Sequence, residues 1–220
     1  GSVDHYKMKM ERYPSIGIGA HTSPNFRHEV TEALQKIDER PSGRRLLQEV
    51  EALSDHDKKV TIVEARPGQA IVAKPRLTPA QWENLGSNPD QKTFDKALIK
   101  NASGSSAFSK RGVASEIPWS KHTAEPNLNE QGVPVEGANP EIAYVALAHE
   151  LIHAKHHLAG TLKYGGEVTR SASSASTPSG KEELRAVGLG KYANSGEPSE
   201  NSIRQEHGLP LRRTYARSGN

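Results

Sequence analysis

Apolar residues recur at helical spacing in the N-terminal part of the chain. Val30, Leu34 and Ile37 follow an i, i+4, i+7 pattern, and the Ser-Pro pair just upstream is typical of a helix start. These features predict an amphipathic helix over residues 23–40. A second short helix is predicted over residues 41–53, because its leucine and valine residues also fall on one helical face.

The central part of the chain alternates between extended and loop-like patterns. Residues 58–65 and 69–75 are rich in β-branched residues and are separated by Arg-Pro-Gly, so we expect them to pair as a β-hairpin. Residues 77–85 have the pattern of a short helix, and residues 112–120 that of an extended strand. Residues 122–140 combine proline, glycine and asparagine and are expected to form a loop.

A longer apolar helix is predicted over residues 140–158. The Asn-Pro pair at 139–140 supplies an N-terminal cap and a first-turn proline, and Gly160 is placed to end the helix. Residues 165–180 are rich in serine, alanine and glycine and are expected to form a mobile loop, followed by a short helix at 181–190. The mixture of helical and extended patterns predicts an α+β fold.

Length and composition indicate one domain with a large share of loop. A chain of 220 residues suits a single core, but only 34% of it is hydrophobic, and it contains 19 glycines and 14 prolines. We assign residues 23–217 to one domain. Residues 1–22 are expected to form a polar N-terminal arm, whose first two residues, Gly-Ser, resemble an expression-tag scar.

Composition also excludes several classes of function. The chain has no cysteine, which excludes disulfides and thiolate metal sites and leaves His, Asp and Glu as strong ligands for a transition metal. No apolar run approaches the roughly 18 residues of a membrane span, so no membrane partner is expected. The net charge of +3 is mild and its basic residues are interspersed with acids, which argues against nucleic-acid binding.

The predicted apolar helix contains the motif His-Glu-x-x-His. His149 and His153 are four residues apart and lie about 6 Å apart along one helical face, so both imidazoles can reach one Zn²⁺. Glu150 lies about 100° round the helix, where a carboxylate can act as a general base on water rather than as a ligand. The motif therefore indicates a zinc-dependent hydrolase.

A catalytic zinc site needs a third protein ligand, and several carboxylates remain possible. His156 lies about 10 Å along the helix axis from His149, too far for both to bind one metal. The longer motif that supplies a third histidine is absent, so the ligand should be a downstream carboxylate. Glu182 and Glu183 are the nearest on a predicted helix, while Glu167 is closer but lies in a Gly-rich stretch.

The segments "HELIHAKHHLAG" and "EELRAVG" together resemble the zinc site of clostridial neurotoxin light chains. The resemblance implies a gluzincin-like site, in which the second Glu of the EEL triplet, Glu183, is the third ligand and Glu182 is its neighbour. It also maps an Arg-x-x-Tyr pair onto Arg212 and Tyr215, whose guanidinium and phenol would stabilise the oxyanion of the transition state.

By size and layout the chain is similar to the NleD-like type III secreted effectors, which are small zinc metalloproteases. The similarity is carried by residues 140–216, including "SENSIRQEHGLPLRRTY". It implies a zincin-type domain with the motif helix packed on a twisted sheet, and a secreted, monomeric endopeptidase that acts in the host-cell cytoplasm. Members of that family cleave mitogen-activated protein kinases in the activation loop, so such kinases are the implied substrates and partners.

Other interpretations remain open on the residues alone. A zinc-stabilised module that binds a host protein without cleaving it would need four protein ligands and no general base, whereas a zinc hydrolase of small amides would share every catalytic residue. Glu200 and Glu206 are candidates to orient the histidine ligands. His156 and His157 are expected to support the site or face the substrate, and His207 could also face it.

The position of a substrate follows from general rules of peptide recognition. We expect an extended peptide to lie beside an edge strand, for which residues 112–120 are the candidate. Residues 76–138 are expected to determine specificity.

Overall fold

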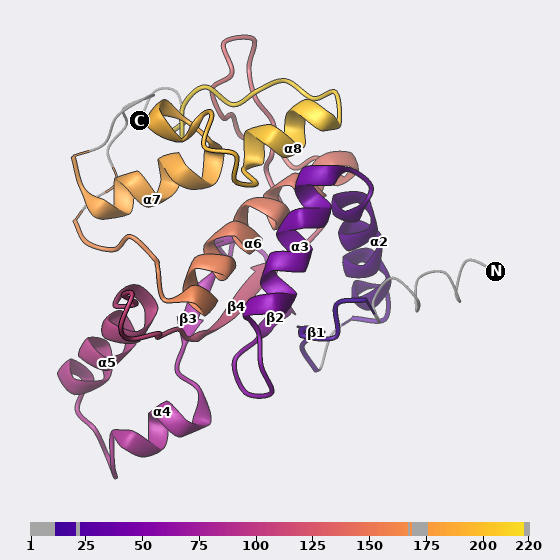
Figure 1. Ribbon diagram of the computed structural model, residues 1–220. Helices are drawn as coiled ribbons and strands as arrows, with labels where there is room; N and C mark the ends of the chain where they lie inside the picture. The colour runs from indigo at the N-terminus through magenta and orange to yellow at the C-terminus, as the bar shows by residue number, and fades with distance from the viewer. Residues whose placement is uncertain (1–11, 21–22, 167, 169–175, 218–220) are drawn as a thin grey trace.

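The computed structural model describes residues 12–20, 23–166, 168 and 176–217. In this part of the chain, a four-stranded sheet packs against a central helix that other helices surround (Figure 1). The strands occur in the order β1-β2-β4-β3; β1, β2 and β4 are parallel, and β3 is antiparallel to β4. Their bounds are β1 Ile16–Ile18, β2 Val60–Glu64, β3 Lys74–Arg76 and β4 Ala114–Trp119.

The helices come from both halves of the chain. The N-terminal half supplies α2 Phe26–Asp38, α3 Pro41–Leu53, α4 Pro79–Asn84 and α5 Gln91–Ser103. The C-terminal half supplies the 3-10 helix η1 Pro140–Ile142, α6 Ala143–Ala159, α7 Pro178–Val187, the 3-10 helix η2 Gly190–Tyr192 and α8 Glu200–Glu206. The predicted α+β fold, with the motif helix packed on the sheet, is confirmed.

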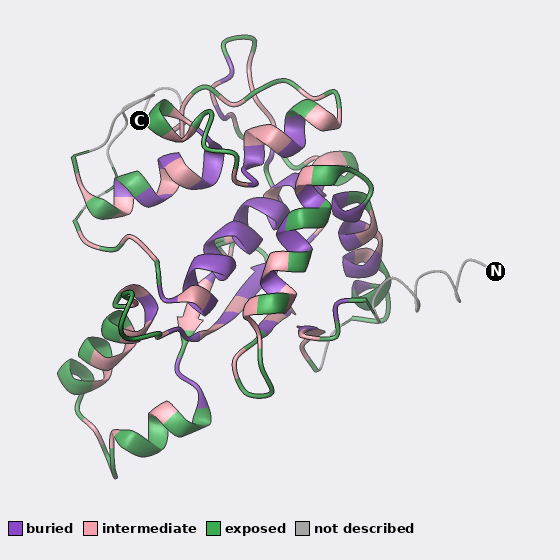
Figure 2. Ribbon diagram, in the orientation of Figure 1, coloured by how far each residue is buried: buried purple, intermediate pink, exposed green. Residues whose placement is uncertain are grey.

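Helix α6 is the centre of the molecule. Fifteen of its 17 residues are buried, because α2, α3, β4, α7 and α8 pack around it (Figure 2). The Asn139 side chain accepts a hydrogen bond from the Glu141 backbone N–H at the start of η1, and Gly160 ends α6 with a φ of 69°. Glycine adopts this left-handed conformation without the steric cost that a side chain brings. The helix predicted for residues 140–158 is therefore confirmed.

The sheet and α6 share one hydrophobic core. Val60, Ile62 and Ile117 are fully buried in the central strands, and Ile62 lies opposite Ile117 in the parallel pair. Leu147 and Leu151 of α6 are equally buried in the same core. Burial of each such side chain contributes about 1.5–3 kcal/mol, which holds α6 firmly against the sheet.

The predicted hairpin of residues 58–65 and 69–75 is wrong. β4 lies between β2 and β3, although it follows them by about 40 residues or more in the chain. Ile117 and Trp119 of β4 are almost completely buried, which favours a central position in the sheet over an edge. A turn signal between two apolar segments cannot show that a strand from later in the chain will insert between them.

The N-terminal region also differs from expectation. Part of the predicted arm, residues 12–20, contains β1 and the buried side chains of Tyr13 and Ile16, whereas residues 1–11 and 21–22 lie outside the described part. The first helix begins at Phe26 rather than near residue 23. Ser23 instead hydrogen bonds to the Glu64 carboxylate through both its backbone N–H and its hydroxyl.

A small unit projects from the main body (Figures 1 and 2). It consists of residues 77–111, which include α4 and α5, and is called the α4–α5 unit below. Its apolar cluster is small and is completed by Val113 and Leu162 from outside the unit: Leu77, Ala102 and Val113 are buried, with Leu85, Phe94, Ala97, Leu98 and Leu162 partly buried against them. The sequence did not predict α5, because its apolar residues are few and only Ala102 is buried.

Among the described residues, no helix is both long enough and apolar enough to span a membrane.

Candidate metal centre and catalytic cleft

The two motif histidines converge on one point. His149 and His153 are one helical turn apart on α6, and their Nε2 atoms lie 3.1 Å from each other. Both side chains are buried, and the two rings meet edge-on with their centroids 4.9 Å apart. The helical spacing of the motif thus produces the predicted shared face.

Two carboxylates orient these rings from behind. His149 Nδ1 lies 2.7 Å from Glu200 Oε1, and His153 Nδ1 lies 2.8 Å from Glu182 Oε2. A carboxylate only accepts, so each Nδ1 carries the donated proton, and each Nε2 faces the convergence point, where it can offer a lone pair to a metal or hold a second proton. Two facing lone pairs 3.1 Å apart repel each other unless a cation or a proton lies between them.

Glu183 completes the group of three donor atoms. Its Oε1 lies 3.2 Å from His149 Nε2 and 2.5 Å from His153 Nε2. Burial raises the pKa of Glu183, but the charges and hydrogen bonds of the two histidines outweigh burial and lower the pKa well below its ordinary value. Burial lowers the pKa of His149, but hydrogen bonds to Glu183 and Glu200 outweigh that effect and raise it to about 9.

The donor set fits a tetrahedral zinc ion. Ligands about 2.0–2.1 Å from zinc are separated from one another by about 3.3 Å in a tetrahedron. Two of the observed separations, 3.1 and 3.2 Å, are close to that value, and the third, 2.5 Å, needs a small outward shift of Glu183. Two imidazoles and one carboxylate leave a fourth position for water or substrate, as a catalytic site requires.

Glu182 occupies a different place from Glu183. Its Oε2 accepts hydrogen bonds from His153 Nδ1 and, at 2.5 Å, from His156 Nδ1. Its Oε1 accepts from the Lys163 backbone N–H at 3.0 Å. Since both oxygens are engaged behind the ligands, the geometry favours Glu183 as the third ligand. Glu167, the other carboxylate considered, lies outside the described residues.

The two extra histidines of α6 do not face a substrate. His156 and His157 are 1% and 2% exposed. His156 contacts Glu182, and His157 Nδ1 lies 2.8 Å from the hydroxyl of Ser115 on β4. Burial, followed by the nearby His153, lowers the pKa of His157 to about 3, so this ring is neutral. Of the two expected roles, only support of the site agrees with the structure.

Glu150 lies beside the donor atoms on the cleft side of α6. Its carboxylate Oε1 accepts a hydrogen bond of 2.7 Å from the Ala73 backbone N–H, and its side chain is buried. Burial raises the pKa of Glu150, and the charges of His149 and His153 only partly oppose this effect. A buried carboxylate with a raised pKa is suited to take up a proton near neutral pH.

Helix α8 links the metal centre to the C-terminal segment. Glu200, at its first turn, is 1% exposed and contacts His149, Arg204 Nε at 2.7 Å and Arg212 Nη1 at 2.9 Å. Burial raises the pKa of Glu200, but Arg212 and His149 outweigh burial and keep it well below its ordinary value. The sequence proposed Glu200 as an orienting residue, but α8 and Arg204 were not predicted, because a seven-residue helix has a weak periodic signal.

Arg212 and Tyr215 come together as the sequence predicted. The Arg212 guanidinium lies 5.0 Å from the Tyr215 ring centroid and donates to the backbone carbonyls of Thr214 and Tyr215. The Tyr215 ring stacks beside His149 at 6.3 Å, and its hydroxyl hydrogen bonds to Glu183. Burial, followed by the Glu183 carboxylate, raises the pKa of Tyr215, so the phenol remains a proton donor.

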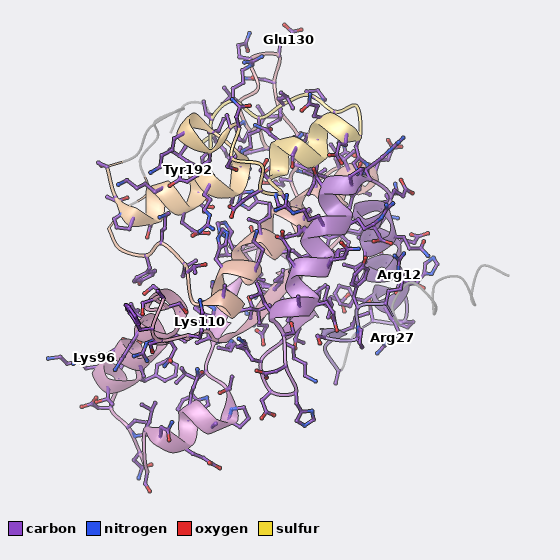
Figure 3. The ribbon with its side chains drawn as sticks, viewed as in Figure 1. Arg12, Arg27, Lys96, Lys110, Glu130 and Tyr192 are labelled. Atoms are coloured by element: carbon purple, nitrogen blue, oxygen red, sulfur yellow. The ribbon has the colours of Figure 1, made fainter. Side chains whose placement is uncertain are left out.

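His149 brings the donor group to the edge of a cleft of about 900 Å³. Its floor includes Val145, Ala146, His149 and Glu150, and its walls come from residues 68–72, from residues within 122–138 and from residues 215–217. Figure 3 labels Glu130 at the tip of the loop that supplies the second wall.

Two expectations about the substrate region need correction. The strand at residues 112–120, β4, lies inside the sheet between β2 and β3, so it cannot offer an edge to a peptide. The edge beside Glu150 is β3, with the segment before it lining the cleft. Of residues 76–138, only those from the loop at 122–138 line the cleft; the α4–α5 unit does not.

Two further candidates also have structural rather than substrate contacts. Glu206 accepts hydrogen bonds from the backbone N–H and hydroxyl of Ser42, whereas Glu200 and Glu182 are the Nδ1 partners of the ligand histidines. His207 Nδ1 lies 3.0 Å from the Tyr144 hydroxyl and does not line the cleft. The backbone N–H of Ala73, by contrast, contacts Glu150 and carries no signal in the sequence.

Comparison with known proteins assigns the family. The model of peptidase family M91, described as effector protein, matches residues 15–215. The chain belongs to the M91 peptidase family of effector proteins. Among solved structures, the light chain of Clostridium botulinum neurotoxin serotype F is similar, with 16% identity and a TM-score of 0.45 over 81% of this chain. The match covers 47% of that light chain, so this chain spans about half its length. A search of curated proteins found no match.

Proposed function

We propose that this M91 effector is a zinc-dependent endopeptidase in which His149, His153 and Glu183 bind Zn²⁺. One observation carries the proposal: three donor atoms converge at the edge of an open cleft, which His149 and the buried carboxylate of Glu150 both line. A purely structural zinc site would be closed by a fourth protein ligand and would have no use for a proton acceptor at its open side.

The protein groups around the cleft suit peptide hydrolysis. A bound zinc ion supplies a Lewis acid that acidifies water and polarises a carbonyl oxygen. Glu150 accepts the proton of the attacking water while the new C–O bond forms, and delivers it to the amine nitrogen as the C–N bond breaks. The Ala73 N–H holds the Glu150 carboxylate in place for both transfers.

Tyr215 and Arg212 are proposed to stabilise the developing negative charge. The Tyr215 phenol lies on the cleft side of Glu183 and stays protonated, so it can donate to an oxyanion. Arg212 lines the cleft and uses three of its N–H groups in the hydrogen bonds to Glu200, Thr214 and Tyr215. Arg212 therefore positions the tyrosine, and its two remaining N–H groups can donate hydrogen bonds to the same oxyanion.

The proposed substrate is a host signalling protein. An extended peptide fits between residues 69–72 at the β3 side and the loop at 122–138 on the other side, where it could pair with backbone groups before β3. Mitogen-activated protein kinases, cut in the activation loop, are the first substrates to test, with the host-cell cytoplasm as the place of action after secretion. We further propose that the enzyme acts as a monomer, without nucleic acid or membrane.

The decisive experiment compares wild type with Glu150→Gln and Glu183→Ala. Each protein is assayed for metal content and is incubated with recombinant kinases and with a peptide library, and products are resolved by intact mass. We expect one zinc per chain in wild type and in Glu150→Gln, cleavage lowered about 10²–10⁴-fold in Glu150→Gln, and metal loss in Glu183→Ala. Asp57→Asn, at an exposed carboxylate that does not line the cleft, is the matched control and should cleave as wild type does.

Two results would contradict the proposal. Retention of zinc by Glu183→Ala would move the third ligand elsewhere. Bound zinc without any cleavage of kinases or library peptides would favour the non-catalytic binding module.

A further inference from the structure

Helix α5 presents a cationic face to solvent. Lys92, Lys96 and Lys100 are spaced four residues apart and so form one stripe, and Ile99 lies within it. All four side chains are exposed, with Ile99 at 37%. This set of four residues is called the α5 face. Figure 3 shows Lys96 extending outward from the projecting unit.

Among the described residues, the charges of the α5 face have no acidic partner. None of its three lysines forms an ion pair or a side-chain hydrogen bond with any residue of the described chain. Like charges four residues apart on a helix destabilise it slightly. By contrast, the buried groups His149, His153, Lys155 and Arg204 each contact a carboxylate.

Two exposed aromatic side chains belong to the same projecting unit. Trp82 of α4 is 46% exposed and stacks on Phe94 of α5 at 4.9 Å, and Phe108, just after α5, is fully exposed. Residues 92–111 contain five lysines and arginines but one acidic residue, a larger excess of positive charge than the +3 of the whole chain. Basic charge and exposed apolar groups are therefore concentrated on this small unit.

We propose that the α5 face and Phe108 form a docking surface for an acidic protein segment that also carries apolar side chains. Carboxylates of such a segment would pair with the three lysines, while its apolar groups would cover Ile99 and Phe108. Electrostatic complementarity of this kind accelerates association and selects partners. That the segment belongs to the protein being cleaved rests on the proposed endopeptidase function.

An acidic protein segment fits this surface better than a lipid bilayer does. A helix that binds a membrane surface turns a continuous apolar face toward the lipid. In α5, that side, which comprises Phe94, Ala97, Leu98 and Ala102, packs inward on the cluster of the α4–α5 unit. The outward side has Ile99 as its one large apolar residue among lysines.

The surface lies near the cleft but outside it. The chain runs from Ala73, whose N–H contacts Glu150, into β3, and α5 packs against both β3 and α6. Residues 73–76 span at most about 10 Å, and α5 itself is about 20 Å long. A substrate that occupies the cleft and the α5 face together therefore needs on the order of ten residues between its cleaved bond and its acidic segment.

The test measures binding of a fluorescein-labelled peptide of alternating acidic residues and leucine by anisotropy. The proteins are wild type, Lys92→Glu/Lys96→Glu/Lys100→Glu, and the matched control Arg27→Glu/Lys59→Glu/Lys191→Glu, which reverses three exposed charges elsewhere. We expect the α5 variant to bind about tenfold more weakly or worse, and the control to stay within about twofold of wild type. Ile99→Ser should weaken binding by a smaller factor, and added salt should weaken it in wild type. Circular dichroism confirms that each variant is folded.

Equal binding by wild type and the α5 variant would overturn the proposal, as would capture of wild type by vesicles of phosphatidylcholine and phosphatidylserine without binding of the peptide. Glu150→Gln should bind the peptide as wild type does. This variant separates the endopeptidase hypothesis from the docking hypothesis. A variant that loses cleavage but still binds the peptide has a damaged active site, whereas a variant that loses only peptide binding has a damaged α5 face.

Discussion

Helix α6 carries six His, Glu and Lys side chains and α5 carries four Lys and Asp side chains, in opposite surroundings. On α6, 15 of 17 residues are buried, and its charged groups contact partners from α3, α7, α8 and the segment before β3. On α5, one of 13 residues is buried, and its lysines face water. A buried ionisable group must be paired to offset its desolvation, whereas an exposed one remains available to another molecule. The contrast separates a rigid chemical centre from a surface suited to recognition.

Removal of the metal should affect the metal centre on α6 strongly and helix α5 little. A ligand that binds only the folded state stabilises it by about 4 kcal/mol at a thousandfold excess over its Kd. A chelator should therefore lower the melting temperature and speed hydrogen exchange in α6, α7 and α8. Exchange in α5 should change little, since no residue of α5 belongs to the metal centre. Equal acceleration in both helices would show that the two regions unfold together.

Glu200→Gln should cost about 3–5 kcal/mol of unfolding free energy, because it leaves Arg204, which is 2% exposed, without its carboxylate. It should also weaken zinc binding by about 10–100-fold, since His149 loses its orienting partner. Urea denaturation and metal titration measure the two effects. Glu206→Gln, on the same helix but bonded to Ser42, is the control and should retain the affinity for zinc; an equal loss there would point to damage of α8 as a whole.

Leu151→Ala and Leu98→Ala compare the two apolar clusters directly. Leu151 is fully buried under the sheet, so its truncation should cost about 2–5 kcal/mol. Leu98 is only partly buried in the small cluster of the α4–α5 unit, and its truncation should cost about 1 kcal/mol. Chemical denaturation measures both, and a reversed order would mean that the projecting unit stabilises the whole fold.

Phe108→Ser should have the smallest effect on stability, within about 0.5 kcal/mol, because the ring is fully exposed. The melting temperature should stay near that of wild type. A large fall would show that the ring is covered in solution, and would remove it from the proposed docking surface.

Much of the metal centre could be predicted because it depends on residues that are close together in the sequence. Four-residue spacing on a helix is sufficient to bring His149 and His153 together, and the Asn-Pro start and Gly160 end of that helix can be identified from neighbouring residues. Glu183, Arg212 and Tyr215 could be named through the resemblance to known zinc proteases, and the structure brings all three to the motif helix. Their chemical roles stay predictions.

Other features depend on contacts between distant segments. The hairpin prediction failed because β4 displaces β3 from β2, and β1 was missed because three residues become a strand only when β2 lies beside them. Likewise, the hydrogen bond from Ala73 to Glu150 joins residues 77 positions apart. Glu200 and Glu206 look alike in the sequence, yet only Glu200 reaches His149, because α8 turns one side toward α6 and the other toward α3.

By itself, the sequence determined the helix that carries the metal motif, the absence of thiolate ligands and the residue types available for proton transfer, since these follow from composition and helical geometry. The tertiary structure alone decided which of two adjacent glutamates faces the donor atoms, which strand borders the cleft, and which lysines remain unpaired. Those outcomes depend on which surfaces are buried against one another, and burial is a property of the whole chain rather than of any short segment.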